Sequence, residues 1–84
     1  MATIYDPAYQ RIVARLREAR QHTGLTQAEV ARKLRRPQSY VSRAEAGQHR
    51  LDVLELLAFA RIYDQSIDFF IQDAFTARKA GSRR

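Results

Sequence analysis

Residues 27–47 read QAEVARKLRRPQSYVSRAEAG, and their pattern predicts two short helices close together. Its first part predicts a short helix, because Thr26 and Glu29 have the spacing of a capping box and Leu25 can pack on Val30. A second helix should begin near Gln38 and end at Gly47. The two predicted helices are separated only by residues 35–37. Two helices joined by so short a connection form a helix-turn-helix, whose second helix can enter the major groove of DNA.

Three further helices are predicted on either side of this motif. Asp6 followed by Pro7 is a favourable helix start, and the helix that follows should end before Gly24. Asp52 with Glu55 repeats the capping-box spacing before an apolar segment that runs to about residue 62. Ser66 caps a last apolar helix at about 66–77. No segment alternates with the period of a strand, so the sequence predicts an all-α fold of five helices.

Length and composition limit the chain to one small domain. Eighty-four residues can close a single hydrophobic core, expected to span residues 1–77. The chain has no cysteine, which excludes disulfides and thiolate metal sites. No apolar run reaches the roughly 18 residues of a membrane span, so no membrane association is predicted. The first residues lack the pattern of a signal peptide, and a cytoplasmic location is therefore expected.

The net charge of +6 is unevenly distributed along the chain. Residues 1–51 hold ten basic and four acidic residues, whereas residues 52–77 hold one basic and five acidic residues. Residues 78–84 add four basic residues and are interpreted as a basic, flexible tail. The positive front half suits a polyanion, and the acidic, apolar back half suits a protein partner.

The spacing of these residues resembles the Cro/cI-type (XRE) family of helix-turn-helix regulators. The resemblance rests on the Thr-Gln-Ala-Glu opening at 26–29 and on Gln38-Ser39-Tyr40-Val41-Ser42-Arg43, followed by Glu45-Ala46-Gly47. Weaker similarity extends from about Arg11 to Phe70. The family implies a lambda-repressor-like DNA-binding domain of five helices, with double-stranded DNA as its partner and no cofactor.

The second helix of the motif is expected to read DNA bases through Gln38, Ser39, Ser42 and Arg43. An amide such as Gln38 can bond to N6 and N7 of adenine. Arg43 is the best candidate for O6 and N7 of guanine, a contact that discriminates by roughly 1–3 kcal/mol. By helical spacing Val41 should point inward, towards Val30 and Leu34.

Contacts to the DNA backbone are expected from Gln27, Arg20, Tyr40 and Arg50. Gln27 begins a helix whose N-terminus favours an anion, and the resemblance implies the same role. The resemblance also implies a partly buried salt bridge between Arg20 and Glu45, with Arg20 near the phosphates and Glu45 mainly structural. Tyr40 is assigned to a phosphate or a thymine methyl group, and Arg50 to the sugar-phosphate backbone.

Two positions depart from the family pattern. Arg35 stands where the turn usually has glycine, so a positive φ there should cost up to roughly 1–2 kcal/mol. Pro37 stands at the cap position, where the family often has Ser or Thr, and it offers no side-chain oxygen. Either change can move the start of the second helix by one residue.

A homodimer is expected, because a single motif reads only a few base pairs. Its two recognition helices would lie about 34 Å apart. The helix at about 66–77 is predicted to form the interface through Phe69, Ile71 and Phe75, although one or two of its phenylalanines must complete the core.

The main alternative is an antitoxin of a toxin–antitoxin pair, which would bind a toxin protein and also its own promoter. A basic domain that binds nucleic acid without sequence preference is another alternative. An enzyme is not expected, since Ser39 and Ser42 lack a catalytic base. His22 and His49 have no spacing typical of metal ligands, so no metal site is predicted.

Overall fold

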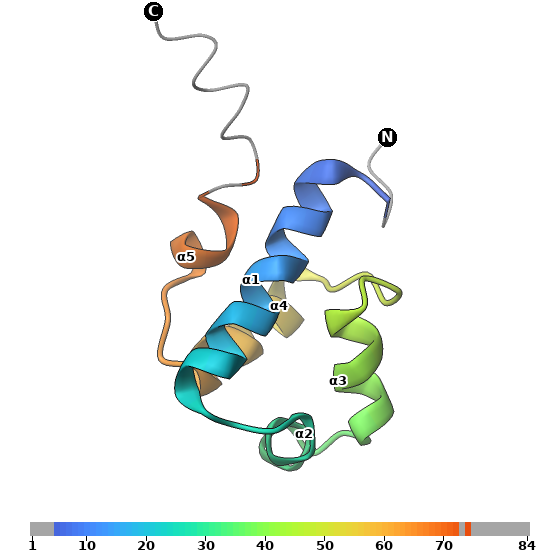
Figure 1. The fold of residues 1–84 in the computed structure, drawn as a ribbon, viewed down its shortest axis with the longest axis vertical. Helices are drawn as coiled ribbons and strands as arrows, with labels where there is room; N and C mark the ends of the chain where they lie inside the picture. The colour runs from blue at the N-terminus through green and yellow to red at the C-terminus, as the bar shows by residue number, and fades with distance from the viewer. Residues whose placement is uncertain (1–4, 73, 75–84) are drawn as a thin grey trace, which may run out of the picture.

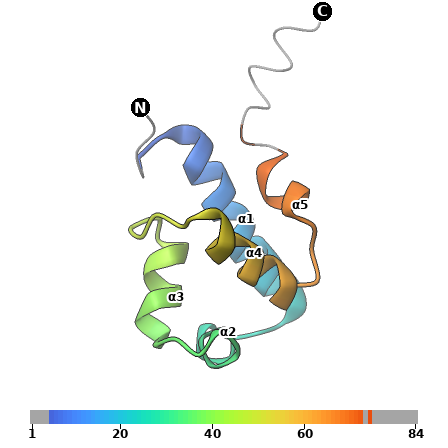
Figure 2. The same cartoon turned by 180° about the vertical axis from the view of Figure 1, so that it is seen from behind.

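The protein is described by a computed structural model that covers residues 5–72 and residue 74. Within these residues there are five helices and no strand: α1 (Pro7–Thr23), α2 (Gln27–Leu34), α3 (Gln38–Glu45), α4 (Val53–Ile62) and α5 (Ile67–Ile71). Helix α1 runs through the middle of the molecule, with α3 on one side, α5 on the other and α2 near its C-terminal end (Figure 1). Helix α4 lies behind α1 in the view of Figure 1 and in front of it in Figure 2. The prediction of an all-α, five-helix fold is confirmed.

Side chains just before the helices fix where they begin. Asp6 accepts a hydrogen bond from the N–H of Ala8 over 2.8 Å, and Pro7 is the first residue of α1. Helices α2 and α4 each begin with a complete capping box, made by Thr26 with Glu29 and by Asp52 with Glu55. These bonds satisfy backbone N–H groups that have no partner within a helix, so short local sequences determine the helix starts.

The core is formed by one face of every helix. Its buried members are Leu16, Ala19, Val30, Ala31, Val41, Ala44, Phe59, Ala60, Tyr63 and Phe70. Helix α1 contacts both α3 and α5, and α2 contacts both α3 and α4. The helix-turn-helix is therefore held by the rest of the domain, since α1 and α4 pack against it from the inside.

Helix α5 is shorter than the sequence suggested. The expected helix extended to about residue 77, whereas α5 ends at Ile71 and is followed by a turn in which Ala74 N–H donates to the Ile71 carbonyl. Ala74 is buried, and its carbonyl accepts a hydrogen bond of 2.8 Å from Arg11 of α1. Phe75 and the basic tail at 78–84 lie outside the described residues.

Candidate nucleic-acid interface

The turn between α2 and α3 depends on a non-glycine residue in the left-handed region. Arg35 has φ 59° and ψ 44°. Its N–H donates to the carbonyl of Arg32, and the N–H of Arg36 donates to the carbonyl of Ala31. These two bonds form a Schellman motif, which satisfies the last carbonyls of α2 while the chain reverses towards α3. Pro37 then precedes α3 without a side-chain capping bond, as its chemistry requires.

Helix α3 has one buried face and one exposed face. Val41 and Ala44 have no exposed surface, and Glu45 is 3% exposed. Gln38, Ser39, Ser42 and Arg43 are all exposed. Positions 38, 39, 42 and 43 are spaced so that they share one side of a helix. The four side chains to which base reading was assigned therefore project together from α3, opposite the face that packs on the core.

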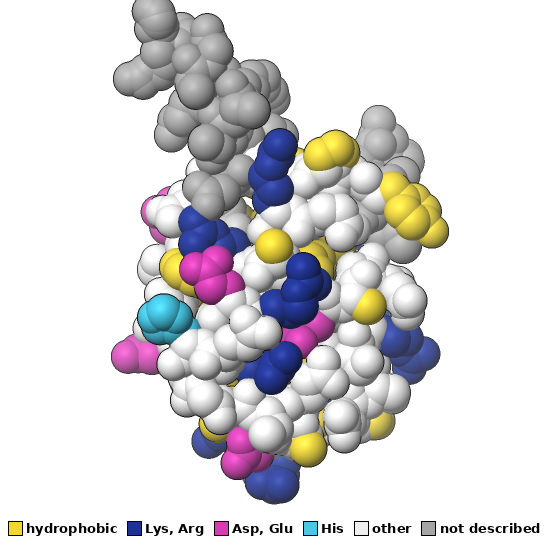
Figure 3. Space-filling model, in the orientation of Figure 1, with side chains coloured by type: hydrophobic (Ala, Val, Ile, Leu, Met, Phe, Trp, Pro, Cys, Tyr) yellow, Lys and Arg dark blue, Asp and Glu magenta, His cyan; other side chains and the backbone are white. Residues whose placement is uncertain are grey.

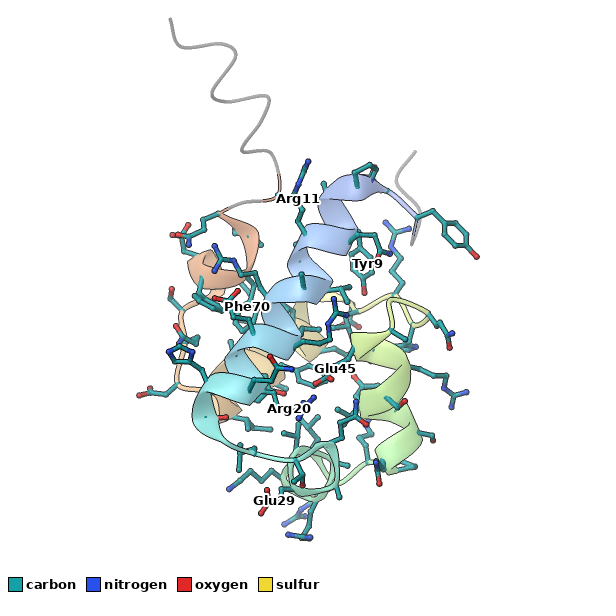
Figure 4. All side chains as sticks on the ribbon, in the orientation of Figure 1. Tyr9, Arg11, Arg20, Glu29, Glu45 and Phe70 are labelled. Atoms are coloured by element: carbon teal, nitrogen blue, oxygen red, sulfur yellow. The ribbon has the colours of Figure 1, made fainter. Side chains whose placement is uncertain are left out.

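The C-terminal end of α3 is held by an ion pair between Arg20 and Glu45 (Figure 4). Nε of Arg20 donates to Glu45 Oε2 over 2.6 Å, and Nη2 donates to Oε1 over 3.1 Å. The third nitrogen, Nη1, donates to the carbonyl of Leu25. Hydrogen bonding to Glu45 raises the pKa of Arg20 above its usual value. The expected salt bridge is present, and the Arg20 side chain is only 17% exposed, which fits its structural role; its contact with a phosphate stays a prediction.

Two more side chains from other parts of the chain contact Glu45. Gln27, the first residue of α2, donates its side-chain amide to Glu45 Oε1 over 3.0 Å. Arg17 of α1 donates to the Glu45 backbone carbonyl. Glu45 thus connects α1, α2 and α3, and fixes the angle at which α3 is presented. The role of Arg17 was missed by the sequence analysis, although it lies one helical turn before Arg20 on α1.

The backbone at the start of α2 remains available to an anion. The capping box occupies the N–H groups of Thr26 and Glu29. No acceptor bonds to the N–H groups of Gln27 and Ala28 among the described residues. A helix N-terminus with free N–H groups attracts a negative charge. The side-chain amide of Gln27 is held by Glu45. A phosphate at the start of α2 would therefore be bound by the backbone N–H groups of Gln27 and Ala28 more readily than by the Gln27 side chain.

Tyr40 packs between α3 and α4. Its ring stacks on Phe59 at a centroid distance of 6.1 Å, and its hydroxyl donates to Glu55 Oε2 over 2.9 Å. Burial and the hydrogen bond to Glu55 raise the pKa of Tyr40 to about 12. His49 Nε2 lies 3.2 Å from the same oxygen. Tyr40 therefore connects α3 to the start of α4, and its contact with a phosphate or a thymine methyl group stays a prediction.

The loop after α3 is fixed by Tyr9 of α1. The Tyr9 hydroxyl donates to the His49 carbonyl and accepts from the Leu51 N–H, both over 3.0 Å. Gly47 begins this loop with φ 76°, in the left-handed region that favours glycine. Arg50, which lies between His49 and Leu51 in this loop, is exposed. Tyr9 was missed by the sequence analysis, but it lies three residues before Ile12, on the side of α1 that faces the core.

Exposed basic side chains surround the helix-turn-helix. Around α2, its turn, α3 and the following loop they are Arg32, Lys33, Arg35, Arg36, Arg43 and Arg50. In the view of Figure 3, basic side chains project at the edge where α3 lies in Figure 1 and at the end where α2 lies. Arg36 also lies over the Tyr40 ring, 4.7 Å from its centroid. A positive surface next to an exposed helix face is the pattern expected for binding to a phosphate backbone.

The residues assigned to a dimer interface have different environments. Phe69 is partly buried against the core, with the Arg15 guanidinium 4.8 Å from its ring centroid. Phe70, its neighbour, is fully buried. Ile71 is 42% exposed. Of the two described residues assigned to the interface, only Ile71 offers much free surface.

Two further features concern metal ligands and membrane-spanning helices in the described part of the chain. Residues 5–72 and 74 contain no cluster of three side chains suited to a metal ion. No described helix has the length and apolar character needed to cross a bilayer.

Comparison with known families supports the reading of the motif. A family model for the helix-turn-helix domain matches residues 11–68, which is more than half of the chain. The match extends from the second turn of α1 to the beginning of α5 and includes the whole of α2, α3 and α4. Comparison with curated proteins and with solved structures found no match. The exposed face of α3, the tight turn before it and this match agree with the Cro/cI-type resemblance, and the chain belongs to the helix-turn-helix domain family.

Proposed function

We propose that this protein is a sequence-specific transcriptional regulator that binds operator DNA as a homodimer through α3. The helix-turn-helix family suggests a DNA-binding regulator, and the exposed face of α3 supports base reading by that helix. Binding would act sterically, either by covering a promoter or by recruiting polymerase beside it. An enzyme is not part of the proposal, because the family is one of DNA-binding domains.

One observation carries the proposal: α3 is rigidly held on one side and exposed on the other. Val41 and Ala44 pack into the core and Glu45 is held by Arg20, while Gln38, Ser39, Ser42 and Arg43 project outward. A preorganised helix loses little conformational freedom on binding, so its polar side chains can discriminate between bases. We assign base reading to the four exposed residues and backbone contacts to Arg50 and the start of α2.

The assignment of Arg43 gives the first prediction. An operator is first selected from a random duplex library, and affinities are then measured by fluorescence anisotropy at one fixed salt concentration. Arg43→Ala should weaken binding to the selected site by about 1–3 kcal/mol, roughly a 5- to 150-fold loss, because a bidentate contact to guanine is removed. Binding to random duplexes should fall much less, since only one charge is lost.

Arg32→Ala is the matched control for Arg43→Ala. Arg32 is an exposed arginine in the last turn of α2, and its removal changes the net charge by the same amount. It should lower affinity for selected and random duplexes about equally. Equal losses on both duplexes for Arg43→Ala would refute base reading by that residue. Failure to select any site would favour the alternative of binding without sequence preference.

The antitoxin alternative concerns the protein partner and not the DNA site. A regulator that also neutralises a toxin would use the same α3 face for its promoter and a separate surface for the toxin. Arg43 is expected to discriminate between bases whether the protein is a regulator only or also an antitoxin. Co-purification of the full chain with the product of a neighbouring gene is the measurement that would separate them.

A further inference from the structure

Arg17 of α1 caps the C-terminal end of α3. Its Nη1 donates to the backbone carbonyl of Glu45, the last residue of α3. The carbonyls of the last helical turn have no partner within a helix, and no backbone N–H bonds to this one among residues 5–72 and 74. The C-terminus of a helix also carries a partial negative charge, which attracts a cation. The Arg17 guanidinium is therefore held at the end of α3.

This contact places Arg17 beside the exposed face of α3. Glu45 follows Gln38 by seven residues and Ser42 by three, so these three residues share one side of the helix. Gln38 and Ser42 are exposed, whereas Glu45 is buried. Figure 4 shows the labelled Glu45 side chain between α1 and α3. Arg17 thus borders the predicted base-reading side chains on the edge of α3 that faces α1.

Arg17 also has N–H groups left for a second acceptor. A guanidinium has five N–H donors, and the Glu45 carbonyl is the one acceptor bonded to Arg17 within the described part of the chain. The Arg17 residue is exposed. In Arg20, by contrast, each of the three nitrogens already donates to Glu45 or Leu25, and the side chain is only 17% exposed. Of the two arginines that contact Glu45, Arg17 is therefore the more accessible to an additional anion.

A basic side chain lies at the other edge of α3 as well. Arg36 is exposed, and its guanidinium lies 4.7 Å from the centroid of the Tyr40 ring, which stacks on Phe59 of α4. Tyr40 and Glu45 are five positions apart, and so about 140° apart around α3, at the two edges of its buried face. A helix in the major groove has a phosphate strand on each side, because the groove is only about as wide as the helix with its side chains. One cation at each edge of α3 matches this arrangement of two strands.

We propose that Arg17 binds a phosphate of the DNA backbone while it caps α3. The inference rests on the proposed function and adds to it a contact from α1, outside the helix-turn-helix. The partial negative charge at the C-terminal end of α3 repels a phosphate, and the Arg17 cation offsets that repulsion. A phosphate contact carries no sequence information, so it acts on every duplex. The Arg17 contact and base reading by α3 can therefore be tested separately.

The salt dependence of binding to a random-sequence duplex tests the contact. Each phosphate that a cation neutralises contributes about 0.9 to the steepness with which log K falls with log salt concentration. Arg17→Gln should lower the steepness by about that amount, so between roughly 50 and 200 mM salt it should lose about three- to fourfold less affinity than the wild type. Arg17→Lys keeps the charge and should keep the wild-type salt dependence. Fluorescence anisotropy measures the affinities, and circular dichroism checks that the variants are folded.

Arg61→Gln is the matched control, because it changes the net charge by the same amount. Arg61 is exposed in the last turn of α4, which lies on the far side of α1 in the view of Figure 1. Its removal should leave the salt dependence unchanged. Unchanged salt dependence for Arg17→Gln would overturn the phosphate contact, and so would an equal change for Arg61→Gln.

A measurement on the wild-type chain covers the case in which Arg17→Gln does not fold. The Arg17 Nε–H signal in heteronuclear NMR spectra should shift when the random-sequence duplex is added, and a signal that does not move would overturn the proposal. A weaker salt dependence for Arg17→Gln, combined with failure to select any operator, would support the Arg17 contact and refute sequence-specific reading. Absence of binding to any duplex would overturn both proposals.

Discussion

At the scale of single residues, buried and half-buried polar groups define the shape of the candidate interface. Glu45 accepts hydrogen bonds from Arg20 and Gln27, and Glu55 accepts them from Tyr40 while it also caps α4. The hydrogen bonds that Glu55 accepts, above all from the Asp52 backbone, lower its pKa. Each carboxylate therefore connects different helices through specific atoms. The orientation of α3 depends on these polar contacts as well as on apolar packing.

Tyr40→Phe distinguishes a structural role of the hydroxyl from contact with DNA. The variant keeps the ring on Phe59 but loses the hydrogen bond to Glu55. The free energy of unfolding at pH 8, measured with urea, should fall by about 1 kcal/mol. Affinity for the selected operator should be unchanged under conditions where the domain is fully folded. A loss of affinity on all duplexes without a loss of stability would instead restore the phosphate contact.

The stability difference between wild type and Tyr40→Phe should also depend on pH. The folded-state pKa of Tyr40 is raised to about 12, from an ordinary value of 10.0. A raised pKa means that the stabilisation is fully present below pH 10 and is lost as the pH rises towards 12. Urea unfolding at pH 8 and pH 11 should show the gap between the two proteins becoming smaller. A gap that widens at pH 11 would contradict the assignment.

At the scale of helices, local signals predicted the starts better than the ends. Asp6, Thr26, Asp52 and Ser66 were expected as caps, and each accepts a backbone N–H in the structure. These caps involve residues two or three apart, so the sequence contains the whole interaction. The end of α5 instead coincides with a contact between Arg11 and Ala74, which are 63 positions apart. No local pattern reveals such a contact, and the predicted helix was too long.

The candidate site shows the same division between near and distant contacts. The exposure of Gln38, Ser39, Ser42 and Arg43 follows from the helical period once Val41 is placed inward. Tyr40 lies on the border between the two faces, so its direction depends on where Phe59 and Glu55 pack. Those residues come from α4, and their distance from α3 cannot be obtained from periodicity. The role of Tyr9 in holding the loop after α3 was missed for the same reason.

The turn between α2 and α3 gives a prediction at this scale. Arg35→Gly should stabilise the domain by up to about 1 kcal/mol, because glycine adopts φ 59° without the strain that a side chain introduces. Thermal unfolding at neutral pH measures the change. Arg36→Gly is the control: it removes the same charge at a position without positive φ, and it should destabilise the domain. Destabilisation of similar size by both variants would show that Arg35 contributes more than its backbone conformation.

At the scale of the whole molecule, the positive helix-turn-helix and the acidic, apolar back half have separate tasks under these proposals. Residues 1–51 carry six more basic than acidic residues, and residues 52–77 carry four more acidic than basic ones. DNA would lie against the first part, and a second copy of the chain against the second part. Since both copies must contact one duplex, the interface determines the separation of the two α3 helices, and so the spacing of the half-sites in the operator.

The spacing of the half-sites can therefore be tested by changing the DNA and leaving the protein unchanged. Inserting five base pairs at the centre of a selected operator turns one half-site to the opposite side of the duplex, because a helical turn takes about 10–10.5 base pairs. Affinity of the wild-type chain should then fall to that of a single half-site. Fluorescence anisotropy on the two duplexes and an isolated half-site measures this. If the wild-type chain tolerates the insertion, each domain binds DNA independently, and recognition by a rigid dimer is wrong even where Arg43 reads its base.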